Sequence, residues 1–183
     1  MKQVTFVTGN PEKARNFSRQ MGADIPHHNV DVDEIQTLDV YKIVEHKAKE
    51  AYKQLKTPVL VEDVQFSMNV LGNLPGPFIK YFVLAENGGE KMCRMLDGFK
   101  DRGVTESCVY GYFDGKTMQY FESELRGVAA EHPKGEQGYG FDRIFIADGF
   151  GGRTAGELDE KEYDEYYSVL KPFAKVKQFL EEA

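Results

Sequence analysis

The amino-acid sequence predicts an α/β protein, in which buried strands alternate with amphipathic helices. Three observations support this fold class. Residues 59–61, Val-Leu-Val, form an aliphatic run that is typical of a strand buried on both faces of a sheet. Residues 38–55 carry apolar side chains at helical spacing. Residues 107–113 and 118–121 flank Asp114-Gly115-Lys116-Thr117, whose Asp-Gly pair is typical of a β-hairpin turn.

The size and charge of the chain limit what it can bind. With 183 residues, of which 41% are hydrophobic, the chain can bury a core, and we expect a single domain over residues 1–183 with two lobes. The formal net charge of -7 argues against binding long nucleic acids through their phosphates. A small anion can still enter a local basic pocket, so we expect any phosphate partner to be small.

Targeting and metal-binding signals are sparse. No run of eighteen apolar residues occurs, and the first residues lead directly into a strand-like segment, so we expect a cytoplasmic protein without a membrane span. Cys93 and Cys108 lack the spacing of metal ligands, and we expect both to be reduced and buried.

The first strand-turn-helix segment is a candidate phosphate site. Residues 4–7 form a short apolar strand, and Asn10 and Pro11 are suited to the N-cap and the first position of a helix. Gly9 would allow a ligand to approach the backbone, the helix start would present free N–H groups, and Lys13 would add a cation. The alternative is an ordinary strand-turn-helix with a solvated lysine.

The next two segments are predicted to be an edge strand and a helix. Residues 30–36, VDVDEIQ, alternate apolar and acidic side chains, and Glu34 stands where the alternation breaks. In the helix predicted over residues 38–55, Lys47 lies at the edge of the apolar stripe. A lysine there either binds an anion, which makes it a candidate phosphate ligand, or extends to the surface.

An acidic pair follows the buried strand. Glu62 and Asp63 come directly after Val61, and we expect them at the end of that strand. Ligands collect at the carboxyl ends of strands in open α/β sheets, and adjacent carboxylates can bind a divalent cation or activate a water molecule. The alternative is a solvated acidic turn. The rigid loop at residues 71–77 contains two glycines and two prolines, and Pro77 is expected in the first turn of a helix.

The C-terminal half contains a second candidate ligand loop. We expect a separate strand over residues 125–130, then a glycine-rich loop over residues 135–142 that could enclose a ligand. Tyr139 and Phe141 in this loop offer flat faces for a nucleobase, or they simply pack in the core. Pro172 either opens the last helix or kinks a longer one.

Taken together, these segments resemble the inosine triphosphate pyrophosphatases, also called the Ham1-like family. The resemblance extends along nearly the whole chain, and the order and spacing of its motifs agree with the family. The residues that carry it are Thr8-Gly9-Asn10 with Lys13, Glu34, Lys47, the run from Val59 to Asp63, the loop from Gly72 to Pro77 with Ile79 and Lys80, and Gly140-Phe141-Asp142.

The resemblance implies a Ham1/Maf-like fold, with a long mixed central β-sheet flanked by helices and two lobes around a cleft. It also implies a homodimer that uses Mg²⁺ to hydrolyse a nucleoside triphosphate to the monophosphate and pyrophosphate. By position, Asp63 and Lys13 are the expected catalytic residues, and Glu34 and Asp63 the expected magnesium ligands. The expected substrate-binding residues are Thr8, Gly9, Asn10, Lys13, Lys47, Tyr139, Gly140, Phe141 and Asp142.

The chain departs from the family pattern in two places. Val64 follows the acidic pair where the family usually has serine or threonine. Residues 162–169, EYDEYYSV, replace the segment in which the family has a Ser-His-Arg motif. Without gaps, Ser168 and Val169 take the histidine and arginine positions, and Tyr163 takes the position of a family lysine.

Two functions agree with these observations. The first is a magnesium-dependent nucleoside triphosphate pyrophosphatase with altered base specificity, because the phosphate and metal positions are present while the base-reading segment differs. The alternative is a non-catalytic nucleotide-binding or interaction protein on the same scaffold.

Overall fold

The computed structural model describes residues 1–138 and 140–182, which form two compact units. Unit 1 comprises residues 1–63, 108–122 and 171–183, and unit 2 comprises residues 64–107 and 123–170. The predicted division into two lobes around a cleft, within one domain, stays a prediction.

Strands of both orientations form the sheet, so the predicted mixed α/β class is confirmed. The strand order is β2-β1-β3-β5-β6-β7, with β4 paired to β3. β1 runs parallel to β2 and β3, whereas β4 is antiparallel to β3 and β7 is antiparallel to β6. The strands are β1 (Thr5–Val7), β2 (His27–His28), β3 (Val59–Met68), β4 (Leu74–Gly76), β5 (Gly103–Phe113), β6 (Met118–Ala129) and β7 (Phe145–Ala147).

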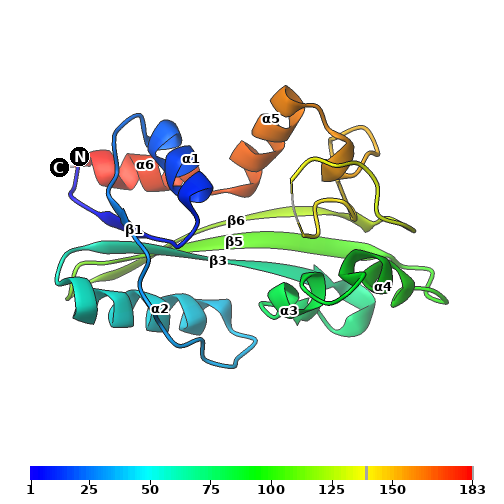
Figure 1. The fold of residues 1–183 in the computed structure, drawn as a ribbon, viewed down its shortest axis with the longest axis horizontal. Coiled ribbons are helices and arrows are strands. Elements are labelled where there is room, and N and C mark those ends of the chain that lie inside the picture. The colour runs from blue at the N-terminus through cyan, green and yellow to red at the C-terminus, as the bar shows by residue number, and fades with distance from the viewer. Residues whose placement is uncertain (139, 183) are drawn as a thin grey trace. The chain divides into compact units, whose positions relative to one another are not determined.

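The helices connect and flank these strands, as Figure 1 shows. They are α1 (Pro11–Met21), α2 (Val40–Leu55), α3 (Ile79–Val83), α4 (Gly88–Arg94), α5 (Glu160–Leu170) and α6 (Phe173–Glu181), with 3₁₀ turns η1 (Asn69–Leu71) and η2 (Ala155–Glu157). No helix within residues 1–138 and 140–182 is long and apolar enough to cross a membrane.

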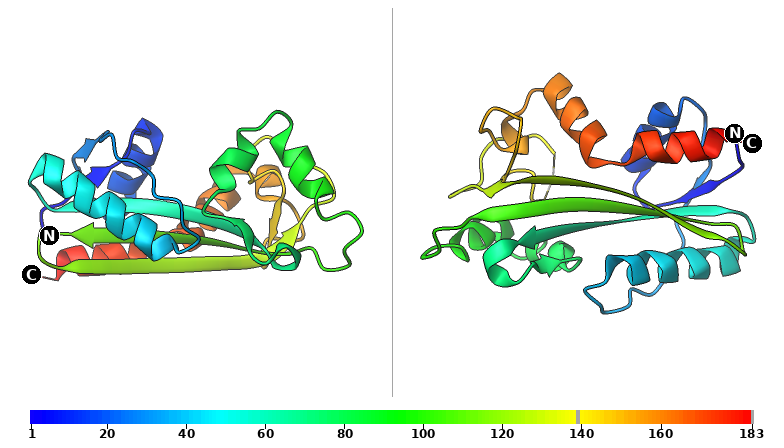
Figure 2. Two further views of the ribbon diagram at one scale, coloured as in Figure 1. Left: turned by 90° about the horizontal axis from the view of Figure 1, so that it is seen from below. Right: turned by 180° about the vertical axis from the view of Figure 1, so that it is seen from behind.

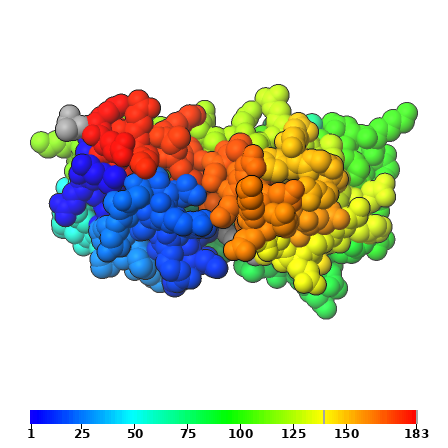
Figure 3. Space-filling view, turned by 90° about the horizontal axis from the view of Figure 1, so that it is seen from above, coloured from blue at the N-terminus to red at the C-terminus, as the bar shows by residue number. Residues whose placement is uncertain are grey.

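Unit 1 has helices on both faces of its strands (Figure 2). On one face, Val44 and Ala48 of α2 pack against Val59 and Val61 of β3. On the other face lie α1 and α6, which Figure 3 shows side by side in blue and red. Aromatic side chains fill that face, namely Phe6, Phe17, Tyr110 and Phe173. Because side chains alternate along a strand, β3 divides its residues between these two environments.

Unit 2 has a separate core. Phe66 of β3 packs edge to face against Phe145 of β7, and Tyr166 of α5 is fully buried beside them. The Tyr166 hydroxyl donates to Glu106 at 2.6 Å, which satisfies a carboxylate that is buried in β5. Burial and this carboxylate raise the pKa of Tyr166 well above its ordinary value.

Local signals located several elements well. Asn10 caps α1 and Pro11 is its first residue, as predicted. α2 begins at Val40 after the cap Asp39, within the predicted helix. Of the two alternatives for Pro172, the opening of the last helix or a kink in a longer one, the structure shows the first, because Pro172 stands at the N-cap position of α6.

The predicted edge strand over residues 30–36 is wrong. These residues have no ladder partner, and the short strand β2 lies upstream at residues 27–28. Val30 and Val32 are nevertheless partly buried against the α2 core. The alternating pattern therefore reflects packing of an irregular segment and not hydrogen bonding in a sheet.

The acidic pair does not end the buried strand as predicted. β3 continues through Glu62 and Asp63 to Met68, because lysines from flanking helices neutralise both carboxylates. Likewise, β6 is one strand where two were expected, and Pro77 precedes α3 instead of lying in its first turn.

Candidate functional site

The site in unit 1 is built around two consecutive residues of β3. The Glu62 side chain lies on the same face of β3 as Leu60, the face covered by α1 and α6. The Asp63 side chain lies on the same face as Val61, the face covered by α2. The β1–β3 register pairs Thr5 with Val59 and Phe6 with Leu60, so the loop after β1 begins beside this acidic pair. The carboxyl end of β1 therefore lies beside the acidic pair, at the kind of sheet edge where ligands collect in open α/β sheets.

Glu62 is held between two lysines. Its Oε1 lies 2.5 Å from Lys13 Nζ and its Oε2 lies 3.3 Å from Lys171 Nζ. Tyr110 also donates a hydrogen bond to this carboxylate. Burial alone would raise the pKa of Glu62, but the two ammonium groups outweigh burial and hold the pKa well below its ordinary value. Glu62 is therefore a permanently charged, structural carboxylate.

Asp63 has a different partner on the opposite face. Lys47 of α2 forms an ion pair with Asp63 Oδ2, and the same ammonium lies 3.8 Å from Glu34 Oε1. Burial raises the pKa of Asp63 above its ordinary value, although the Lys47 ammonium opposes this shift. A raised pKa makes Asp63 a better proton acceptor than Glu62.

The two faces have opposite charge balance in these clusters. On the α1 face, two ammonium groups, Lys13 and Lys171, meet one carboxylate. On the α2 face, two carboxylates, Asp63 and Glu34, share one ammonium. The first arrangement favours a further anion and the second favours a further cation.

The loop after β1 is more fully hydrogen-bonded than predicted. Asn10 Oδ1 accepts from the N–H groups of Glu12 and Lys13, and Pro11 has no N–H. The expectation of free N–H groups at this helix start is therefore wrong. Thr8 Oγ1 accepts from the Asn10 N–H at 3.1 Å, which leaves its own hydroxyl proton to donate. A phosphate bound here would receive its hydrogen bonds from side chains more than from backbone N–H groups.

Gly9 lies against the end of the Asn29 side chain. A Cβ at Gly9 would lie 2.8 Å from Asn29 Oδ1, which is closer than such atoms approach. An added Cβ would displace the end of the exposed Asn29 side chain, so packing alone does not require a glycine here.

The predicted magnesium ligands come together. The Glu34 and Asp63 carboxylates both contact the Lys47 ammonium, which stands where a metal cation between them would stand. The described residues contain no group of three or more His, Cys, Asp or Glu side chains able to hold a metal. Mg²⁺ is commonly bound through one or two carboxylates together with substrate phosphates and water, so two carboxylates fit that use.

The predicted base-binding residues belong to unit 2. Phe141 packs against Phe66 with ring centroids 5.0 Å apart, and Gly140 has φ of +68°. Asp142 is buried, and its Oδ2 accepts a hydrogen bond from the Tyr163 hydroxyl at 2.8 Å. Tyr139 lies outside the described residues.

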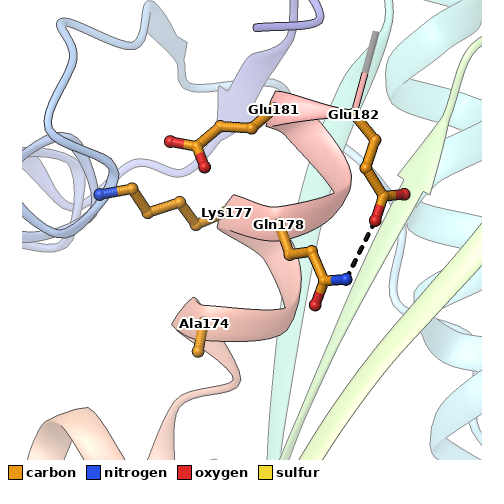
Figure 4. Close-up of a pocket in the computed structure, with 5 residues that line it drawn as sticks. All are labelled: Ala174, Lys177, Gln178, Glu181 and Glu182. Carbon is orange, nitrogen blue, oxygen red and sulfur yellow. Dashed lines mark hydrogen bonds between the residues drawn. The ribbon is translucent and has the colours of Figure 1, made fainter.

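An open hollow with a volume of about 440 Å³ lies on α6 (Figure 4). The residues that line it are Ala174, Lys177, Gln178, Glu181 and Glu182. None of these is a predicted site residue, and Gln178 is already bonded to Glu182 at 3.0 Å.

Comparison with known proteins shows the family of this chain. The model of the Ham1 family matches residues 4–179. The chain belongs to the Ham1 family. It is 37% identical over 186 residues to the inosine triphosphate pyrophosphatase of Batrachochytrium dendrobatidis, covering 99% of this chain and 95% of that protein. It is 36% identical over 163 residues to inosine triphosphate pyrophosphatase 2 of Trypanosoma cruzi, covering 87% and 83%.

Solved structures show the same fold. The HAM1 protein from Coxiella burnetii superimposes with a TM-score of 0.88 at 22% identity, covering 100% of both chains. The Ham1 protein of Staphylococcus aureus gives a TM-score of 0.84 at 21% identity, covering 98% of both. The resemblance stated from the motifs, including the Ham1-like fold, is confirmed.

Two contacts of this Ham1-family protein are not predicted by its sequence pattern. Lys171 lies between α5 and α6, and nothing in its local pattern predicts that it is buried. Tyr163, which takes the position of a family lysine, donates to Asp142, and the sequence pattern does not predict this contact. A Cβ at Gly138 would lie 2.1 Å from Asp142 Oδ2, so the glycine-rich loop packs directly on this pair.

Proposed function

We propose that this Ham1-family protein is a magnesium-dependent nucleoside triphosphate pyrophosphatase, which releases the nucleoside monophosphate and pyrophosphate. The observation that carries the proposal is the opposite charge balance on the two faces of β3 at Glu62 and Asp63. A triphosphate with its metal ion needs an anion site and a cation site next to each other. The names of the relatives, inosine triphosphate pyrophosphatases, support this choice of reaction.

The phosphate groups bind at the start of α1. Lys13 is partly exposed there, and its ammonium exchanges Glu62 for a phosphate oxygen when the substrate binds. The Thr8 hydroxyl donates a further hydrogen bond. Asn10 contributes indirectly, because its carboxamide oxygen is committed to capping the helix.

Asp63 is the general base of the proposed reaction. Its pKa is raised by burial, so it accepts a proton from an attacking water molecule more readily than an ordinary aspartate does. Glu34 and Asp63 would hold Mg²⁺, which when bound neutralises phosphate charge. Lys47, released from these carboxylates, binds the triphosphate.

We further propose that base specificity is altered. Phe141 offers a stacking face, and stacking accepts any base. Strong discrimination needs polar groups that pair with one edge of the base. In this chain, Asp142 is bonded to the Tyr163 phenol, and residues 162–169 contain no histidine or arginine. We expect inosine triphosphate to be preferred over adenosine triphosphate only weakly.

A pyrophosphate-release assay tests both parts of the proposal. The panel is inosine, xanthosine, adenosine and guanosine triphosphates, each with and without MgCl₂. We expect release that depends on magnesium and varies little among bases. Binding of nucleotides without release of pyrophosphate would favour the non-catalytic alternative. A preference for inosine triphosphate by several orders of magnitude would refute the altered specificity.

The proposal includes a homodimer. Tyr81 and Leu84 of unit 2 are 61% and 74% exposed, and such large apolar side chains are typical of interaction surfaces. Light scattering measures the mass directly. We expect a dimer for the wild type and a monomer for Leu84→Asp, and a monomeric wild type would refute this part.

A further inference from the structure

Three side chains from distant parts of unit 1 form one ionic cluster. Glu62 of β3 bridges Lys13 of α1 and Lys171, which precedes α6. The two lysines bind different oxygens, with Lys13 at Oε1 and Lys171 at Oε2. Either lysine can therefore leave without disturbing the contact of the other.

The two lysines differ in exposure. The side chain of Lys171 is 3% exposed and that of Glu62 is 7% exposed, whereas that of Lys13 is 25% exposed. Lys171 also lies 3.5 Å from the sulfur of Cys108, whose pKa is raised to about 12, chiefly by burial. The thiol is neutral and adds no negative charge, so the cluster keeps two positive charges around one carboxylate.

We infer that Lys171 is a positioning residue that acts as the standing counter-ion of Glu62, so that Lys13 can move to a phosphate oxygen. The inference rests on the proposed function, because it requires Lys13 to bind the substrate. It assigns to Lys171 a part in substrate binding without contact between Lys171 and the substrate.

The physical reason is the cost of an unpaired buried charge. A buried carboxylate that loses its cationic partner is strongly destabilised. When Lys13 turns to the substrate, Glu62 keeps the Lys171 ammonium, so the carboxylate stays paired. Without Lys171, Lys13 would be the remaining ammonium partner of Glu62 in this cluster. Substrate binding would then have to separate Lys13 from that carboxylate.

Inorganic tripolyphosphate is the probe, and isothermal titration calorimetry measures its dissociation constant. The variants are Lys171→Met, which keeps the unbranched side chain up to the Cε position and removes the ammonium group, Glu62→Gln, and the double variant. Lys175→Met is the matched control, because Lys175 is an exposed lysine of α6 that donates to the Glu122 carbonyl at 2.7 Å. KM and kcat for inosine triphosphate are measured in parallel.

We expect Lys171→Met to weaken tripolyphosphate binding and to raise KM by about tenfold or more, with a smaller change in kcat, and Lys175→Met to behave as wild type. Adding Glu62→Gln should bring the double variant back within about threefold of wild type, because Lys13 no longer has a carboxylate to leave. Such strong coupling is expected only for residues in one network.

A merely structural Lys171 gives a different result. The effects of Lys171→Met and Glu62→Gln would then add, and the double variant would bind worst, which would overturn the inference. If Lys171→Met does not fold, Glu62→Gln is compared with the double variant. In the Glu62→Gln background, the added Lys171→Met substitution should then change the dissociation constant of tripolyphosphate by less than about threefold. A larger loss of affinity refutes the inference. Wild-type protein that does not bind tripolyphosphate would overturn the proposed phosphate site itself, and this inference with it.

Discussion

Glu62 and Asp63 are consecutive residues, yet their carboxylates bind lysines from helices on opposite faces of β3. Glu62 pairs with Lys13 of α1, and Asp63 pairs with Lys47 of α2. The alternation of side chains along a strand causes this division. One residue therefore organises a cluster with excess positive charge and its neighbour a cluster with excess negative charge, and each can be tested by itself.

Asp63→Asn should abolish turnover and leave the fold intact. The carboxamide has the shape of the carboxylate but neither accepts a proton at neutral pH nor binds Mg²⁺ well. We expect kcat/KM for pyrophosphate release to fall on the order of a hundredfold or more. Asp31→Asn, an exposed residue of unit 1, is the control. Wild-type rates in folded Asp63→Asn protein would remove Asp63 from catalysis.

Lys47→Met should make the protein's stability depend on magnesium. The variant leaves Glu34 and Asp63 without the ammonium that they share, so Mg²⁺ no longer competes with Lys47. A cation that binds only the folded state stabilises it by an amount that grows with the logarithm of the ratio of its free concentration to its dissociation constant, so tighter binding gives a larger increase in Tm. We expect a larger Tm increase with MgCl₂ in Lys47→Met than in wild type. Its absence, or an equal increase in Lys47→Met/Glu34→Gln, would contradict the predicted magnesium pair.

Tyr163→Phe should destabilise unit 2 and change base preference. The substitution removes the hydroxyl that donates to the buried Asp142, and the loss of such a donor costs about 1–3 kcal/mol. Urea unfolding measures this cost. The ratio of kcat/KM for inosine to adenosine triphosphate should also shift, because Asp142 then offers an acceptor to the base. Glu165→Gln, a change at an exposed residue of α5, should change neither quantity.

Glu162→Gln should destabilise the protein in a pH-dependent way. Arg153 binds both oxygens of Glu162, at 2.7 and 2.9 Å, and together with the Asp159 N–H lowers its pKa from 4.5 to about 2. A lowered carboxyl pKa contributes stability above the unfolded value of 4.5, and this contribution is lost as the pH falls toward about 2.

Tm measured from neutral pH downward tests this prediction. Glu162→Gln should melt below wild type at neutral pH, and the difference should narrow steadily as the pH falls below 4.5. A difference that is constant with pH would show that the ion pair is not its cause.

Much of the fold follows from local patterns. The cap at Asn10, Pro11 in the first turn of α1 and the apolar stripe of α2 depend on neighbours within one or two helical turns. Each of these signals is contained in a short stretch of the sequence. The candidate residues Lys13, Glu34, Lys47 and Asp63 could also be predicted from the motifs, and unit 1 brings them into two clusters.

Only the tertiary structure decided which charges meet. Lys13 is 49 residues from Glu62 and Lys171 is 109 residues from it, so no local pattern relates them. The same reason explains why β3 continues through its acidic pair, since the lysines that neutralise it come from elsewhere in the chain. Buried charges are stable only with their partners, and those partners are brought together by the packing of α1, α2 and the segment before α6 on the sheet.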